Sequence, residues 1–298
     1  MAMELMEKME AFKDSFSIRN NPTRLRKRAD KDGYLFIKRL VEPEAVWQVR
    51  HDILSIAKKH GLLKPNTNVM DGIANPEVRY IEAACDQWKE YYTEIQACRS
   101  FHQLAHHPNI VALFENLFGK KVLVHPRNIS RTIFPNLTKF TTPPHQDYFY
   151  IKGTPNTWTL WTPLGDCNDD LGGLAVAPGT HKLGMLDVRK ADGAGGHACP
   201  TDPDFKWVYN ETSCGDVVMF HSYIIHQGRD NSTVDKIRLS CDYRYQPMDE
   251  DVHPSSLLPH FNLKPWEEVY RDWPKNDKLQ FFWKNEELKV KGDVLNPA

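Results

Sequence analysis

The sequence lacks any apolar run long enough to form a transmembrane helix. Its N-terminus is acidic and has no continuous hydrophobic stretch, so it does not resemble a secretory signal. The formal net charge is −1 at pH 7, which provides no basic surface for nucleic acid or for an anionic membrane. We therefore expect a cytoplasmic protein that binds neither nucleic acid nor a membrane.

Paired cysteines and internal repeats are also absent from the sequence. Its six cysteines are scattered and form neither a CxxC motif nor a Cys/His spacing typical of zinc sites. A chain of 298 residues can bury a large core without disulfides, so reduced thiols are expected. No segment recurs at a fixed period, which excludes a solenoid or a propeller.

The first 120 residues carry mostly helical patterns. An amphipathic N-terminal helix is predicted by apolar side chains at helical spacing, namely Leu5, Met9, Phe12 and Phe16. The patterns that follow predict, in order, a solvated turn region, a strand, a helix and a further helical segment, at residues 20–33, 33–40, 43–61 and 78–120.

From residue 121 the pattern changes to short strands. Segments rich in β-branched and aromatic residues, bounded by Gly, Pro, Asn and Asp, lie at residues 122–134, 156–166, 173–181, 215–226 and 238–247. The polar, glycine-rich segment 184–214 is typical of a lid or a binding loop, and residues 255–298 predict helices. This order predicts a fold that is mainly β with flanking helices, a β-sandwich or a cupin-like jelly roll.

We expect one domain over residues 1–298, because no linker is long enough to separate two. It would consist of a helical part at 1–120, a jelly-roll core at about 121–250 and a C-terminal helical extension at 255–298. The oligomeric state is not predicted.

One short motif suggests a metal site. In the stretch TTPPHQDYFY, His145 and Asp147 are two residues apart. On a strand, such residues point to the same face, so an imidazole and a carboxylate can reach one point. A second histidine would complete the 2-His-1-carboxylate set that holds non-haem Fe(II) and leaves open positions for oxygen and a co-substrate.

Two histidines in the later strands compete for the third position. His221 and His226 are five residues apart, so they lie on opposite faces of any continuous strand. His226 comes at the strand end, just before the QGRDNS turn, where a ligand can reach the mouth of a barrel. We favour His226 as the ligand and His221 as a packing residue.

A candidate carboxylate-binding pair follows on the next strand. Arg238 and Ser240 share one face, and arginine can bind a carboxylate through two hydrogen bonds while a hydroxyl adds a third. The pair would suit the distal carboxylate of 2-oxoglutarate, whose keto acid end would chelate the iron. A solvent-facing arginine is the alternative interpretation.

Together these motifs resemble the phytanoyl-CoA dioxygenase family of Fe(II)- and 2-oxoglutarate-dependent oxygenases, which have a double-stranded β-helix fold. The resemblance covers roughly residues 30–247. It depends on the order of HQD, GGLAVAPGTHK, GD, H-x4-NS and R-x-S, at residues 145–147, 172–182, 215–216, 226–232 and 238–240.

The resemblance implies that His145, Asp147 and His226 hold iron and that Arg238 and Ser240 bind 2-oxoglutarate. Further positions that it assigns to the co-substrate pocket are Trp161, Asn128 and Thr132. Arg127 and Arg131 would then face away from the pocket, unless the strand register slips by one residue.

The implied activity is hydroxylation of an unactivated C–H bond in a small organic metabolite, or its desaturation or cyclisation, with release of succinate and CO2 from 2-oxoglutarate and O2. Halogenation is not expected, because Asp147 keeps the carboxylate that related halogenases replace. An aromatic wall at Tyr148–Tyr150 and Trp158 would suit a natural-product intermediate or an amino-acid-like metabolite. The alternative is a jelly-roll metalloprotein of another class, either an isomerase or hydrolase, or a non-catalytic ligand-binding protein.

Overall fold

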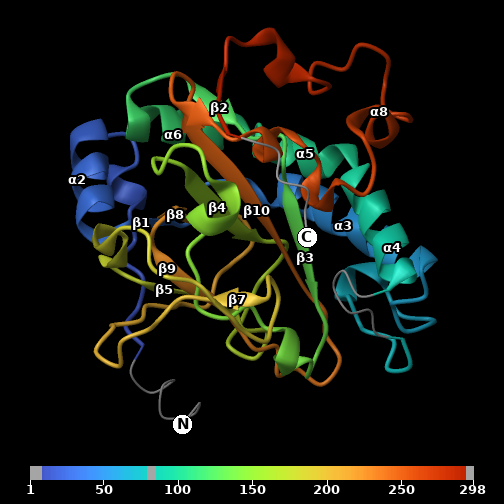
Figure 1. Ribbon diagram of the computed structural model, residues 1–298. Helices are drawn as coiled ribbons and strands as arrows, with labels where there is room; N and C mark the ends of the chain where they lie inside the picture. The colour runs from blue at the N-terminus through green and yellow to red at the C-terminus, as the bar shows by residue number, and fades with distance from the viewer. Residues whose placement is uncertain (1–8, 79–84, 293–298) are drawn as a thin grey trace.

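A computed structural model of the chain describes residues 9–78 and 85–292 (Figure 1). Its centre is a six-stranded antiparallel sheet in the order β1-β8-β4-β10-β2, with β3 also paired to β10. These strands are β1 (Tyr34–Ile37), β2 (Val122–Val124), β3 (Ile129–Ile133), β4 (Trp158–Pro163), β8 (Val217–His221) and β10 (Arg238–Pro247). A second, two-stranded antiparallel sheet is formed by β5 (Gly173–Ala177) and β9 (Ile225–Arg229).

Strand β10 is the longest strand and organises the large sheet. All ten of its residues are buried, and it pairs with β2, β3 and β4. Its odd-numbered side chains, from Leu239 to Tyr245, belong to the main apolar core. Its even-numbered residues are all polar and include Arg238 and Arg244. Because successive side chains on a strand alternate, one face of β10 packs against the apolar core and the other carries buried polar groups.

Helices cover the apolar face of the large sheet. Figure 1 shows them packed along one side of it, and they are α2 (Pro22–Asp32), α3 (Pro43–Lys59), α4 (Asp86–Gln96), α5 (Arg99–Ala105) and α6 (Pro108–Phe118). Fully buried side chains such as Val46 and Phe114 join the strand residues in one core cluster. The chain is therefore a mixed α/β protein with antiparallel sheets, and the predicted flanking helices are present between residues 43 and 118.

Two N-terminal predictions were wrong. Residues 20–33, expected to be a turn region, contain α2, which begins with Asn21 capping the Arg24 amide and ends at Gly33 with φ 73°. The expected amphipathic helix is not formed in its described part, because Glu10 bridges Val208 and Asp14 bridges Phe36 in extended pairings. A short 3-10 turn follows at Phe16–Ile18. Leu5 lies outside the described residues.

The C-terminal segment is less helical than expected. It forms α8 (Trp266–Val269) and several 3-10 turns, and its tryptophans pack into a separate apolar cluster with Leu123 and Val252. The strands β11 (Asp251–Val252) and β12 (Lys289–Val290) pair in parallel beside it. No helix among the described residues combines the length and apolar character that a membrane crossing requires.

Candidate active site

Three buried side chains come together between the two sheets. His145, Asp147 and His226 each offer a ligand atom, and these atoms lie within 4.8 Å of one another. The Nε2 atoms of His145 and His226 are 3.6 Å and 3.8 Å from Asp147 Oδ1. Two imidazole nitrogens and one carboxylate oxygen at this separation can coordinate one metal ion.

The backbone brings His145 and Asp147 together in a way that the sequence did not predict. His145 does not belong to a continuous strand; it forms an isolated antiparallel bridge with His226. Asp147 has helical backbone angles and immediately precedes the short helix α7 (Tyr148–Ile151). The two side chains therefore converge across a bridge and a helix start, whereas the prediction placed both on one face of a strand.

His226 is the third ligand candidate because the strand breaks between it and His221. Strand β8 ends at His221, and β9 begins at Ile225 after a tight turn. His226 then lies in the second sheet opposite Val176, whereas His221 pairs with Trp158 in the large sheet. The ring of His221 contacts Trp158 and lies outside the cluster, as a packing residue does.

Both imidazoles are oriented by backbone carbonyls. His145 Nδ1 lies 2.9 Å from the Pro143 carbonyl oxygen, and His226 Nδ1 lies 3.2 Å from that of Ile224. A ring that donates Nδ1–H to a carbonyl presents a lone pair at Nε2, which is the arrangement of a metal-ligating histidine. Burial lowers the pKa of His226 to about 3, so this ring is neutral and able to ligate at neutral pH.

Asp147 is held by two further side chains. The Thr159 hydroxyl donates a hydrogen bond to Asp147 Oδ2, and Arg244 Nη2 lies 3.4 Å from the same oxygen. Burial raises the pKa of Asp147, but the Arg244 guanidinium and the two histidines more than offset it and hold the pKa well below its usual value. Asp147 is therefore an ionised carboxylate in a fixed orientation.

A small inner cavity of about 20 Å³ next to the cluster is lined by Arg238 of the predicted carboxylate-binding pair, and Ser240 lies two residues further along the same strand. The cavity is also lined by His145, Asp147, His226, Trp161 and Gly173, among others. Arg238 is 6% exposed and donates from Nη1 to the Gly173 carbonyl, while its Nε has no hydrogen-bond partner in the described part of the chain. The buried Ser240 hydroxyl is likewise without one. Buried hydrogen-bond donors that lack partners, next to three residues that could hold a metal ion, suit a ligand that carries a carboxylate.

An outer pocket of about 460 Å³ opens on the other side of the cluster. His145, Asp147 and Arg131 line both the inner cavity and this outer pocket. The remaining wall includes Arg127 and Arg244 beside apolar side chains. A pocket of this size fits a small organic molecule, and it brings such a molecule directly to the metal-type cluster.

Two positions that the resemblance assigned to the co-substrate pocket face the other way. The side chain of Asn128 contacts His102 Nδ1 at 3.2 Å, and the Thr132 hydroxyl lies 2.8 Å from that of Tyr91. Both partners belong to the helical layer. Arg127 and Arg131 line the outer pocket instead, so the predicted facing was wrong by one residue of strand register.

The aromatic run after Asp147 is divided between pocket and packing. Tyr150 lines the outer pocket, and its hydroxyl donates to the Gly195 carbonyl of the long loop at 3.2 Å. Tyr148 packs edge-on against Tyr223 instead. The loop carries a small hairpin of β6 (Arg189–Lys190) and β7 (His197–Ala198), and its connecting residues 193–196 line the pocket. Trp158 is buried in the apolar core.

Sequence reasoning missed Arg244 and Thr159, although a signal for Arg244 was present. In RLSCDYRYQP, polar and apolar residues alternate strictly, and Arg244 has the same parity as Arg238 and Ser240. That pattern predicts one continuous polar face. Thr159 carries no comparable signal, because its partner Asp147 is reached only through the fold.

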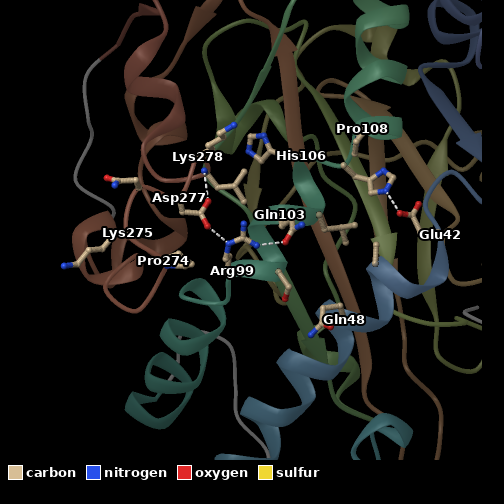
Figure 2. A pocket seen from close by; sticks show the side chains of 16 residues that line it. Glu42, Gln48, Arg99, Gln103, His106, Pro108, Pro274, Lys275, Asp277 and Lys278 are labelled. Carbon is tan, nitrogen blue, oxygen red and sulfur yellow. Dashed lines mark hydrogen bonds and ion pairs between the residues drawn. The ribbon is translucent and has the colours of Figure 1, made fainter.

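A second, larger cleft of about 810 Å³ lies between α3, α5 and the C-terminal segment (Figure 2). Arg99 forms an ion pair with Asp277, and His107 Nε2 lies 2.9 Å from a Glu42 carboxylate oxygen. Lys275 and Lys278 also line the cleft. Burial lowers the pKa of His106 to about 4, so its ring is uncharged at neutral pH. Because no group of residues that could hold a metal ion occurs among its described residues, this cleft is the weaker candidate in spite of its size.

Two histidines and one carboxylate at the meeting point of a cavity and a pocket define the class of site, a 2-His-1-carboxylate centre. A family model described as phytanoyl-CoA dioxygenase matches residues 29–240. The chain belongs to this family of iron- and 2-oxoglutarate-dependent oxygenases, as the order of its motifs predicted. The family assignment makes it an enzyme of the 2-oxoglutarate-dependent dioxygenase class.

Characterised relatives support the family across most of the chain. The 1-deoxypentalenic acid 11-beta-hydroxylase of Streptomyces arenae is 27% identical over 262 residues, which cover 83% of this chain and 86% of the relative. The peroxisomal phytanoyl-CoA dioxygenase of Rattus norvegicus is 28% identical over 245 residues, covering 76% of this chain and 70% of the relative.

Solved structures share the fold at lower identity. The epimerase SnoN from nogalamycin biosynthesis, in complex with Fe3+, alpha ketoglutarate and nogalamycin RO, matches with a TM-score of 0.55 at 22% identity. This match covers 92% of this chain and 97% of SnoN. The carbocyclase SnoK from the same biosynthesis matches with a TM-score of 0.52 at 21% identity, covering 79% of this chain and 88% of SnoK.

Proposed function

We propose that this protein is an Fe(II)- and 2-oxoglutarate-dependent hydroxylase of a small organic metabolite. The observation that carries the proposal is one continuous site in which the His145–Asp147–His226 cluster separates two compartments. The inner cavity measures only about 20 Å³, so its side chains would have to move apart to hold the co-substrate. The outer pocket would hold the molecule to be oxidised. Desaturation and ring closure begin with removal of the same kind of hydrogen atom and remain variants of the proposal.

The three ligand residues fit Fe(II) by donor type and by number. The Nε2 atoms of His145 and His226 and a carboxylate oxygen of Asp147 would hold the iron, and they match the 2-His-1-carboxylate donor set. Bound iron would supply the oxygen chemistry, in which oxidation of 2-oxoglutarate to succinate and CO2 drives cleavage of a substrate C–H bond. Because Asp147 is retained, the site has no vacancy for a halide, and we expect no halogenation.

Arg238 and Ser240 fit the distal carboxylate of 2-oxoglutarate. Arg238 is anchored to the Gly173 carbonyl through one nitrogen, so its Nε and the Ser240 hydroxyl remain to bind an anion. The indole of Trp161 contributes an apolar wall to the same cavity. An isomerase or hydrolase that used the metal alone would not need this buried pair, which argues against the alternative class.

We also propose a specific fold and a single-domain organisation for the chain. Two antiparallel sheets that enclose the cluster support a double-stranded β-helix, with residues 1–298 as one domain. All six cysteines are free thiols, which supports the cytoplasmic location expected from the sequence.

Anaerobic addition of Fe(II) and 2-oxoglutarate to the purified protein tests the proposal. A bidentate complex of the keto acid with Fe(II) gives a weak metal-to-ligand charge-transfer absorbance in the visible range, which we expect for the wild type. His145→Ala should abolish it, because one of three ligands is lost. His221→Ala is the matched control and should keep the absorbance, since His221 lies outside the cluster. Folded wild-type protein without the absorbance would contradict the proposal.

A further inference from the structure

The outer pocket contains a concentration of buried and half-buried positive charge. Three guanidinium groups line it, those of Arg127, Arg131 and Arg244. Arg244 is 4% exposed. Burial lowers the pKa of Arg127 to about 10, which still leaves its guanidinium charged at neutral pH. Buried cations are costly unless an anion or hydrogen-bond acceptors compensate them, so the partners of these groups are informative.

The protein compensates this charge incompletely. Arg131 pairs with Asp242 at 2.7 Å, but Arg244 reaches only Asp147, at 3.4 Å, and its Nε has no hydrogen-bond partner in the described chain. Arg127 donates to the Ser255 carbonyl at 3.2 Å and forms no ion pair with any carboxylate that the structure describes. Asp147 is the only acid in the described lining of the pocket.

The other ionisable groups that line the pocket do not change its excess of positive charge. Burial, with Arg127 and Arg244 nearby, lowers the pKa of His260 well below its usual value, so its ring is neutral. Burial also raises the pKa of Tyr150 to about 12, so its hydroxyl is neutral as well. If Asp147 held a metal cation, its negative charge would be shared with that cation, and Arg244 would lose part of the compensation that this carboxylate provides.

The rest of the pocket is apolar. Ile129, Phe140, Ile151 and Phe261 line it, together with the glycine-rich segment 193–196 of the long loop. A ligand that matches both parts has an anionic head for the arginines and a hydrocarbon body for this wall. A volume of about 460 Å³ accommodates a compact molecule of this kind.

We propose that the substrate is a compact organic acid whose carboxylate is bound by Arg127 and Arg244 in the outer pocket. This assignment rests on the proposed function, since it identifies the molecule that the oxygenase site would oxidise. Two guanidinium groups that line one pocket can hold a carboxylate through charge-assisted hydrogen bonds.

The test compares acids with their neutral amides. Adamantane-1-carboxylic acid, decanoic acid and 1-naphthoic acid, each with its primary amide, are titrated calorimetrically into protein loaded anaerobically with Fe(II) and 2-oxoglutarate. We expect at least one acid to bind about tenfold or more tightly than its amide, the discrimination typical of a hydrogen-bonded charge. Equal affinity for acid and amide, or no binding by any of the acids, would overturn the assignment.

Substitution of Arg127 tests whether this residue binds the carboxylate of the acid. Arg127→Met should weaken acid binding by about tenfold to a hundredfold and leave amide binding nearly unchanged. Arg24→Met is the matched control, because Arg24 is an exposed residue of α2, and it should bind like the wild type. A similar effect of both variants on acid binding would contradict a role for Arg127. If Arg127→Met does not fold, the acid-to-amide comparison on the wild type decides alone.

The two proposals fail in different ways. Loss of the proposed function would appear as an absent charge-transfer absorbance, whatever the acids do. Loss of the acid assignment would appear as missing acid preference in protein that does show the absorbance. Acid binding that depends on Arg127 in protein without the absorbance would support the arginine site and overturn the oxygenase.

Discussion

His145 and His226 face each other across a single antiparallel bridge. Each donates its backbone N–H to the carbonyl of the other, at 3.0 Å and 3.1 Å, and their ring centroids are 4.1 Å apart. Two residues 81 positions apart in the sequence are therefore fixed as a pair by backbone hydrogen bonds, before any metal binds. Such preorganisation keeps two of the three ligands in place, so metal affinity should depend strongly on how the third, Asp147, is oriented.

Thr159 provides the test of that orientation. Thr159→Val removes the hydroxyl that donates to Asp147 and keeps the shape of the side chain. We expect Fe(II) affinity to fall by about tenfold or more, in the range typical of lost partners of a metal ligand. Equilibrium dialysis under anaerobic conditions measures the affinity.

Thr162→Val is the matched control, because Thr162 is also buried on β4 but donates to the Asp216 carbonyl at 3.2 Å, away from the cluster. It should bind iron like the wild type. Equal iron affinity in both variants would show that Thr159 does not position Asp147.

Arg238 and Ser240 should determine the co-substrate requirement. Arg238→Lys keeps the charge but loses the planar fork of donors, so we expect the KM for 2-oxoglutarate to rise by about tenfold or more. Ser240→Ala should raise it less, by about fivefold, because one neutral hydrogen bond is lost. Iron content should stay near that of the wild type in both variants. Loss of iron with an unchanged KM would mean that the roles are assigned to the wrong residues.

The order of the motifs in the sequence was sufficient to predict the His145–Asp147–His226 cluster and to place Arg238 beside it, whereas the co-substrate role of Arg238 and Ser240 stays a prediction. His145, Asp147, His226 and Arg238 all lie at the expected site. The local backbone geometry of His145 and Asp147 was predicted incorrectly. The helical backbone of Asp147 depends on α7, a helix of four residues with no periodic signal of its own.

The direction in which the side chains of a strand face was harder to predict than the position of the strand in the sequence. Side chains in and just before β3 alternate between the pocket and the helical layer, and the sequence does not say which set faces the pocket. A shift of one residue places Arg127 and Arg131 in the pocket instead of Asn128 and Thr132. The decisive contact, between Thr132 and Tyr91 of α4, joins segments far apart in the sequence. The pattern of α2 was obscured by its charged residues, although Asn21 before Pro22 and Gly33 at its end are ordinary signals of a helix.

Buried histidines should make the stability of the protein pH-dependent. Burial lowers the pKa of His102 and of His125 to about 4 in the folded chain, below the value of about 6.5 for an exposed histidine. Between these values the unfolded chain binds more protons, so stability is fully present above pH about 6.5 and decreases as the pH falls towards 4. Each histidine should contribute a loss of roughly 2–3 kcal/mol over this range.

Urea unfolding at a series of pH values measures this dependence. His125→Gln removes one titrating group and keeps a donor for Gln246, the present partner of His125 Nε2 at 2.8 Å. The free energy of unfolding of this variant should decrease less steeply than that of the wild type below pH about 6.5, and the two should run parallel above pH about 7. Identical slopes at low pH would show that His125 is not a source of the dependence.

The residue between the two metal ligands connects the cluster to the long loop. Gln146 is 1% exposed; its Nε2 donates to the carbonyls of Gly184 and Tyr223, and its Oε1 accepts from the Leu186 amide at 2.8 Å. Gln146→Leu leaves these backbone groups without their partner, at a cost of about 1–3 kcal/mol for each one that stays buried. We expect the start of the loop to open more often, while iron still binds.

Hydrogen exchange followed by mass spectrometry distinguishes this outcome from general destabilisation. Peptides that contain Gly184 and Leu186 should exchange faster in Gln146→Leu, and peptides from β10 should keep the protection of the wild type. Gln103→Leu is the control, since Gln103 contacts Arg99 at the surface cleft and not the loop. Faster exchange throughout the sheet would indicate global unfolding instead. Unchanged exchange at residues 184–186 would show that Gln146 does not hold the loop closed over the pocket.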